Sequence, residues 1–246
     1  MVIVRNWRNQ DPYVGHISAI IWPLFRQVDM ADPKPADMAQ LRGMSGFVKH
    51  ALQGRRTSDH HSHDTIEQMY YILKGRGQVL IGDEKRDVQE GDAIYLPVNL
   101  PHQAFNDGDD WMEHLIVSCP LRDVHQGTPA VRNWRNTPPV IGTHKAVVWD
   151  LLSPEGTGSP EEGAVLQRMH RVVRETVQGR RATTLHQVDG VEQVYYVVHG
   201  RGMVVSEGTT QGIMEGSGVF VPPGAPHQIV NDGDDWLEYV IFSAGV

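Results

Sequence analysis

The sequence predicts an all-β protein made of two similar antiparallel barrels of the jelly-roll type. Two observations lead to this fold class. Short runs rich in β-branched and aromatic residues alternate with glycine, proline and Asp-Gly pairs, which is typical of strands joined by tight turns. The second half of the chain also repeats the first. Many short strands with evenly spaced turns favour closed barrels, because closure removes exposed sheet edges.

The expected strands fall at matching places in the two halves. In the first half they are Met69–Leu73, Gln78–Ile81, Ala93–Leu96 and Leu115–Val117. In the second half they are Gln193–Val198, Gly202–Ser206, Gly218–Val221 and Leu237–Phe242. Between residues 29 and 44, an Asp-Pro-Lys-Pro run precedes Ala36–Leu41, where we expect a loop followed by a short helix.

The repeat extends over nearly the whole chain. Val4–Asn9 recurs as Val131–Asn136, and the segment Asn106–Trp111 recurs unchanged at Asn231–Trp236. The offset is 127 residues early and 125 later, so the second copy is two residues shorter between these landmarks. Such a pattern indicates a tandem duplication. We expect the Val-Arg-Asn-Trp-Arg-Asn segments to cross between the two barrels.

Each copy is expected to form one domain, the first over residues 1–122 and the second over residues 123–246. Hydrophobic residues make up 40% of the chain and charged residues 21%, as in ordinary soluble globular proteins. The net charge of -8 argues against nucleic acid as a partner, since phosphate binding needs a basic surface. No leader-like or membrane-spanning apolar run is present, so a cytoplasmic location is expected.

A group of histidines in the first copy points to a metal. His61 and His63 stand two positions apart, and residues i and i+2 of an extended chain share a face. His102 follows about forty residues later, after a turn at Pro97. If a neighbouring strand brings His102 to the same point, three imidazoles make a metal-binding face.

These residues resemble the two signature motifs of the cupin family. The first motif is matched by Gly54, His61, His63 and Gly75, with one extra residue after Gly54 and with Gln68 at the position of the family's glutamate. The second motif is matched by Gly91, Pro97, His102 and Asn106, with Asn99 in place of a glycine. Asparagine and glycine both tolerate the left-handed backbone. The resemblance implies two cupin barrels, a bicupin.

The resemblance also implies the ligand set His61, His63, Gln68 and His102, holding one divalent transition metal such as Zn, Mn, Fe or Ni in the first barrel. Glu67 competes with Gln68, because a slip of one residue would turn the carboxylate inward instead. The spacing to Gly75 favours Gln68. A neutral ligand set leaves the full charge on the ion, which makes it a stronger Lewis acid and a stronger anchor for an anion.

Three function classes remain open. Cupins that carry glutamine at this position include non-oxidative enzymes, which favours Lewis-acid chemistry of the lyase, isomerase or cyclase type on a small polar or anionic molecule. An Fe(II)-dependent dioxygenase acting on an aromatic or dicarbonyl substrate is the alternative, and a non-catalytic sugar- or ligand-binding bicupin is the third. The candidate catalytic residues are Tyr70, His50 and His114. The resemblance also suggests a homodimer.

The second copy has an incomplete ligand set. His186, Gln193 and His227 correspond to His61, Gln68 and His102, but Val188 stands where the second histidine should be. Losing one ligand removes much of the binding energy for a divalent ion. We therefore expect a degenerate metal site in the second barrel.

Overall fold

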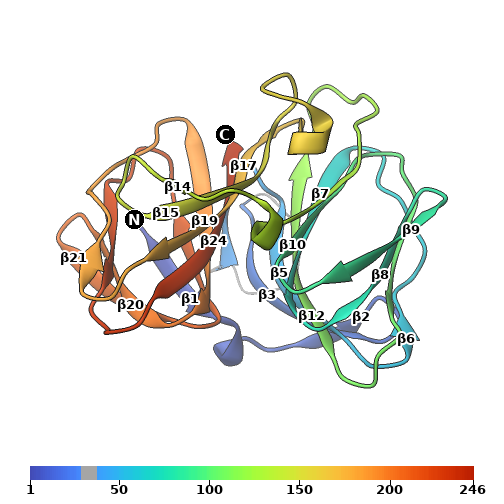
Figure 1. Ribbon diagram of the computed structural model, residues 1–246, viewed down its shortest axis with the longest axis horizontal. Coiled ribbons are helices and arrows are strands. Elements are labelled where there is room, and N and C mark those ends of the chain that lie inside the picture. Colours follow the sequence, from blue (N-terminus) through green and yellow to red (C-terminus); the bar gives the residue numbers. More distant parts are fainter. Residues whose placement is uncertain (29–37) are drawn as a thin grey trace.

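The computed structural model describes residues 1–28 and 38–246 as two β-barrels packed side by side (Figure 1). Each barrel combines an eight-stranded sheet with a four-stranded sheet. The helices in the described residues are 3-10 turns of three residues, and none is long or apolar enough to cross a bilayer.

Within residues 1–28 and 38–122, the first half of the chain supplies the strands β1 to β12 and the 3-10 turn η1. Its elements are β1 (Ile3–Asn6), η1 (Trp7–Asn9), β2 (Tyr13–Gly15), β3 (Ala19–Gln27), β4 (Ala39–Leu41), β5 (Gly46–Leu52), β6 (Arg56–Thr57), β7 (Ile66–Lys74), β8 (Arg76–Ile81), β9 (Glu84–Gln89), β10 (Asp92–Leu96), β11 (His102–Asn106) and β12 (Met112–Pro120). In the N-terminal barrel the large sheet has the order β13-β10-β7-β12-β5-β3-β2, with β4 paired to β3, and the small sheet has the order β6-β11-β8-β9.

The second half repeats this arrangement. Its elements are β13 (Ala130–Asn133), η3 (Trp134–Asn136), β14 (Val140–Ile141), β15 (Val147–Pro154), η4 (Pro160–Glu162), β16 (Ala164–Leu166), β17 (Met169–Val177), β18 (Arg181–Ala182), β19 (Val191–His199), β20 (Arg201–Ser206), β21 (Thr209–Met214), β22 (Ser217–Val221), β23 (His227–Asn231) and β24 (Leu237–Gly245). The C-terminal barrel has the large sheet β1-β22-β19-β24-β17-β15-β14, with β16 paired to β15, and the small sheet β18-β23-β20-β21.

The two halves exchange one strand each. β1 pairs antiparallel with β22, so the first strand of the chain completes the sheet of the C-terminal barrel. β13 pairs antiparallel with β10 in the N-terminal barrel. The repeated Val-Arg-Asn-Trp-Arg-Asn segments therefore cross between the barrels as expected. Each half of the chain, divided at the expected boundary between residues 122 and 123, therefore contributes one strand to the barrel of the other half.

The all-β prediction is confirmed, and each of the eight expected strands lies within an observed strand. The short helix expected at Ala36–Leu41 is wrong over Ala39–Leu41. Ala39–Leu41 is the strand β4, because it pairs in parallel with β3 through Arg26 and Gln27. Residues 29–37, which include the expected loop and the first two residues of the expected helix, lie outside the described residues.

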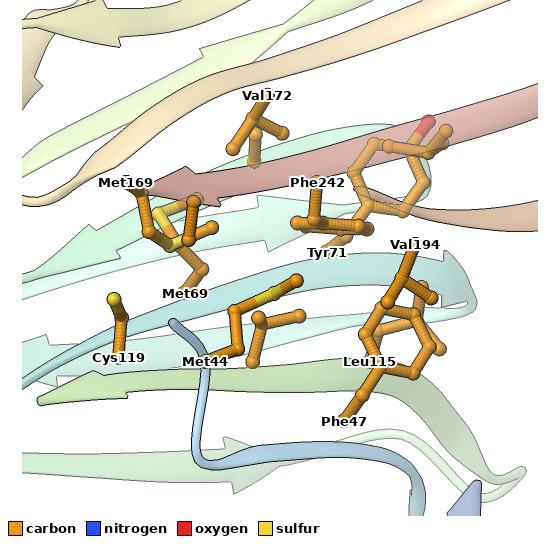
Figure 2. Close-up of a cluster of buried hydrophobic side chains, with 14 of the residues drawn as sticks. Met44, Phe47, Met69, Tyr71, Leu115, Cys119, Met169, Val172, Val194 and Phe242 are labelled. Carbon is orange, nitrogen blue, oxygen red and sulfur yellow. The ribbon is translucent and has the colours of Figure 1, made fainter. Parts of the chain in front are cut away.

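The largest buried apolar cluster lies between the two barrels. Figure 2 shows side chains from both halves meeting in it, among them Phe47 and Met69 of the first half and Met169 and Phe242 of the second. The Phe47 and Phe242 rings lie 5.5 Å apart in an edge-on arrangement. The shared core and the exchanged strands join the two barrels into one body.

Two buried carboxylates fasten the barrels at repeat-related positions. Glu67 accepts hydrogen bonds from three successive backbone N–H groups of the second half, at 2.7–3.0 Å; the donors are Gln167, Arg168 and Met169. Glu192 accepts three from the first half, at 2.7–2.9 Å; these donors are Arg42, Gly43 and Met44. Both glutamates are fully buried. The alternation along β7 that sends Glu67 toward the other barrel turns its neighbour, Gln68, to the opposite face.

Candidate metal centre

The chain brings His61 and His102 together through backbone pairing. His61 donates its backbone N–H to the His102 carbonyl at 3.2 Å, and His102 donates its own to the His61 carbonyl at 2.8 Å. Asn99 donates its backbone N–H to the His63 carbonyl at 2.8 Å, and its φ of 58° is left-handed, as the motif required. The turn after Pro97 thus sets His102 beside the His61–His63 segment.

The three imidazoles converge. The ring centroids of His61 and His102 lie 4.5 Å apart, those of His61 and His63 5.0 Å, and those of His63 and His102 5.4 Å. One potential ligand atom from each ring lies within 4.8 Å of the other two. His102 is buried, whereas His61 and His63 are half-buried.

The hydrogen bonds of these rings leave the nitrogens that a metal needs. The Nδ1 atom of His102 lies 3.1 Å from the Leu100 carbonyl, and that of His61 lies 3.2 Å from the Asp59 carbonyl. A carbonyl oxygen only accepts, so Nδ1 carries the proton and Nε2 keeps its lone pair in the neutral ring. The Nε2 atoms of His63 and His102 are buried without a hydrogen-bond partner. Buried unpaired polar atoms are costly, and a metal ion would satisfy these two.

Burial also keeps the His63 and His102 rings in the neutral form that binds metal. It lowers the pKa of His102 to about 4. Burial and the neighbouring His61 lower the pKa of His63, and the Gln68 side chain offsets only part of this lowering. These imidazoles therefore do not need to lose a proton near neutral pH before they can act as ligands.

Gln68 supplies a fourth potential ligand atom. Its amide nitrogen donates to the Ser118 hydroxyl at 3.2 Å, and its buried Oε1 has no hydrogen-bond partner. Glu67, the competing candidate, directs its carboxylate to the backbone of the other barrel and also accepts a hydrogen bond from the Tyr95 hydroxyl at 3.0 Å. The donor set available in the N-terminal barrel is thus three imidazoles and one amide, all uncharged.

Two further residues belong to this site, and sequence reasoning missed them. His16, at the tip of the β2–β3 hairpin, places Nδ1 2.6 Å from the Asp59 carboxylate and lays its ring against His61, with centroids 5.3 Å apart. The other oxygen of Asp59 lies 3.3 Å from His61 Nδ1. Asp59 stands two residues before His61, which is a usable signal for a supporting carboxylate. His16 carries no such signal.

The candidate catalytic residues lie in the interior of the same barrel. His50 and His114 face each other across β5 and β12, with ring centroids 4.8 Å apart. Tyr70 lies 5.0 Å from the His114 ring and 6.3 Å from the His102 ring. Burial lowers the pKa of His50 to about 2 and that of His114 to about 3, and burial raises the pKa of Tyr70. All three side chains are therefore uncharged at neutral pH.

The C-terminal barrel differs at its centre. His186 and His227 adjoin, with ring centroids 4.3 Å apart, but Val188 offers no ligand. Tyr195 donates its hydroxyl to Nε2 of His227 at 2.7 Å. Within the part of the chain that the structure describes, both groups of at least three converging potential ligands lie in the N-terminal barrel.

The cupin domain family matches residues 48–118 and 173–243, which together are more than half of the chain. The chain therefore belongs to the cupin family and carries two cupin domains, as its motifs and its two barrels indicate. Among curated proteins, it is 43% identical over 60 residues to the uncharacterized protein MJ1618 of Methanocaldococcus jannaschii. That match spans 24% of this chain and 48%, about half, of the relative.

Three solved structures have folds similar to that of this chain. The putative glyoxylate-induced protein of Pseudomonas aeruginosa aligns with a TM-score of 0.78 at 11% identity, over 100% of this chain and 89% of that one. Oxalate decarboxylase of Bacillus subtilis aligns at 0.72 and 14%, over 98% and 75%. The bacterial pirin YhhW of Escherichia coli, in complex with nickel(II), aligns at 0.73 and 18%, over 100% and 99%. At these identities the likeness shows the fold alone.

Proposed function

We propose that this protein is a metal-dependent cupin enzyme whose N-terminal barrel holds one divalent transition ion through His61, His63, His102 and Gln68. The observation that carries the proposal is the set of buried acceptor atoms without partners on converging side chains. Imidazole nitrogens and an amide oxygen suit Zn, Mn, Fe or Ni. The nickel(II) complex of the similarly folded pirin is consistent with such a centre.

When bound, the ion supplies Lewis-acid polarisation of a carbonyl, hydroxyl or carboxylate oxygen. The chain's own residues provide the surroundings. The uncharged donor set does not neutralise the ion, so a small anionic or strongly polar molecule is the favoured substrate. Asp59 holds the His61 ring from behind, and this kind of support fixes ring orientation and raises ligand basicity. The buried wall formed by Tyr70, His50 and His114 offers hydrogen-bonding groups without charge.

The first test is the metal content of purified protein. We expect about one divalent ion per chain, from the single complete ligand set. His63→Ala should lose the ion while keeping its circular dichroism spectrum. The matched control is Val188→Ala, which changes the equivalent position of the C-terminal barrel and should keep the ion. Folded wild-type protein that takes up no metal under replete conditions contradicts the proposal.

A second measurement separates the proposed Lewis-acid enzyme from the dioxygenase alternative. Iron-loaded protein is placed in an oxygen electrode with aromatic and dicarbonyl compounds. Oxygen consumption that depends on His63 would favour the dioxygenase. Turnover of an oxygen-bearing substrate under nitrogen, with zinc or manganese in place of iron, would favour Lewis-acid chemistry.

A further inference from the structure

Six side chains of the N-terminal barrel form a closed circuit of neighbouring rings. In order they are His61, His16, His50, His114, Tyr70 and His102, and each ring centroid lies 4.5–6.3 Å from the next. Two of these residues belong to the proposed ligand set. His50 and His114 lie in the part of the circuit away from His61 and His102.

His50 and His114 carry hydrogen-bonding groups without partners. Both ring nitrogens of His50 and Nδ1 of His114 are buried and unpaired, and the two residues are 2% and 1% exposed. Leaving such a group unsatisfied costs about 1–3 kcal/mol, so native proteins retain one where a ligand or water completes it. A neutral imidazole offers one N–H donor and one acceptor, which together match a hydroxyl group.

In the C-terminal barrel, the side chains at the two equivalent positions hydrogen-bond to each other. Glu175 and Tyr239 stand in place of His50 and His114. Tyr239 donates its hydroxyl to Glu175 at 3.2 Å, so this pair satisfies itself. The unpaired groups are therefore a special feature of the barrel that has the complete ligand set.

We propose that His50 and His114 form a second, metal-free subsite, which hydrogen-bonds an uncharged hydroxyl or carbonyl oxygen of a substrate whose anionic end is held at the ligand set. This inference rests on the proposed function and narrows it. The substrate class becomes a small hydroxy- or oxo-carboxylate. The charged end belongs at the ligand set because the four donor atoms proposed for the ion carry no charge of their own. The uncharged end belongs at His50 and His114 because burial keeps both rings neutral.

The test uses cobalt-loaded full-length protein, whose visible absorption reports ligands near the ion. The probes are acetate, propionate and butyrate, each compared with its counterpart that carries a terminal hydroxyl group. We expect one hydroxylated probe to bind about tenfold more tightly than its plain counterpart, the effect of one net hydrogen bond. In His50→Leu/His114→Phe this advantage should disappear, while the plain acids keep their affinity.

The matched control makes the equivalent change in the other barrel. Glu175→Leu/Tyr239→Phe should retain the hydroxyl advantage. If His50→Leu/His114→Phe does not fold, the graft His50→Glu/His114→Tyr replaces it, because the duplicated barrel already accommodates that pair. In the graft the paired side chains satisfy each other, so the advantage should again be lost.

The possible failures are distinguishable. If cobalt binds and no hydroxyl group brings an advantage, the subsite is wrong and the proposed function stands. The same conclusion follows if the advantage persists in His50→Leu/His114→Phe, since chelation of the ion by both oxygens would then explain it. Wild-type protein that takes up no cobalt overturns the proposed function and the subsite together.

Discussion

The hydroxyl group of Tyr195 lies 2.7 Å from Nε2 of His227 and donates a hydrogen bond to it. The repeat-related pair in the N-terminal barrel is Tyr70 and His102, and there the Nε2 atom has no partner. In the second barrel, the hydrogen bond from Tyr195 thus occupies Nε2 of His227. In the first barrel, the equivalent Nε2 of His102 stays available. Together with Val188, the Tyr195 hydrogen bond leaves the second barrel fewer available ligand atoms than the first.

This difference predicts how a second centre could be restored. Val188→His supplies the missing imidazole, and Tyr195→Phe releases Nε2 of His227. We expect the double variant to bind about two ions per chain instead of about one, because four ligands are then available in each barrel. Metal analysis after dialysis measures the ratio, and Tyr195→Phe alone is the control. A ratio that stays at one in the double variant would contradict the role given to Tyr195.

Asp59 contacts the proposed ligand His61, and its counterpart in the second barrel is Thr184. We expect Asp59→Thr to weaken metal affinity about 10–100-fold without unfolding the protein, because carboxylates behind a ligating histidine orient the ring and raise its basicity. Competition with a chelator measures the affinity. Asp109→Asn removes an equal charge at an exposed position of the same barrel and should leave it unchanged. Equal losses of metal affinity in both variants would show that Asp59 acts only through its charge and not by orienting His61.

Glu67 holds the two barrels together. Glu67→Ala leaves three backbone N–H groups of residues 167–169 without an acceptor, so we expect the free energy of unfolding to fall by roughly 3 kcal/mol or more. Urea denaturation measures the change. Glu192→Ala, its repeat-related counterpart, should cost a similar amount, and both variants should still bind metal. Loss of the ion in folded Glu67→Ala would instead identify Glu67 as a ligand.

The buried histidines predict the pH dependence of stability. In the folded protein, burial lowers the pKa of His50 to about 2 and that of His114 to about 3, from an ordinary value of 6.5. As the pH falls below 6.5, the unfolded chain gains protons that the native protein does not bind, so stability present above that pH is lost. Each histidine contributes about 1.4 kcal/mol per pH unit in this range.

The measurement is urea denaturation of metal-free protein between about pH 7 and pH 5. We expect His50→Gln/His114→Gln to lose clearly less stability on acidification than the wild type, because it lacks two of the histidines whose protonation the fold opposes. The remaining histidines, which include His102 and His227, still contribute in both proteins. Identical pH profiles would show that His50 and His114 are not protected from protonation in the fold.

Much of the architecture was readable from local patterns. The duplicated segments, the strand runs and the spacing of His61, His63 and His102 follow from residue order, because strand periodicity and turn residues act over a few positions. The left-handed turn at Asn99 was predictable for the same reason. The short helix expected at Ala36–Leu41 did not form over Ala39–Leu41, because pairing with β3 outweighed local propensity there.

The sequence by itself determined a twofold all-β cupin chain with one complete and one incomplete set of candidate ligands, since these properties reside in residue types and their spacing. Only the tertiary structure decided which strands receive the crossing segments, β22 for β1 and β10 for β13. It alone also decided that Glu67 binds the opposite barrel and that His16 joins Asp59 beside His61. Each of these relationships joins residues tens of positions or more apart. Contacts of that kind depend on how sheets pack in space, and no local pattern encodes them.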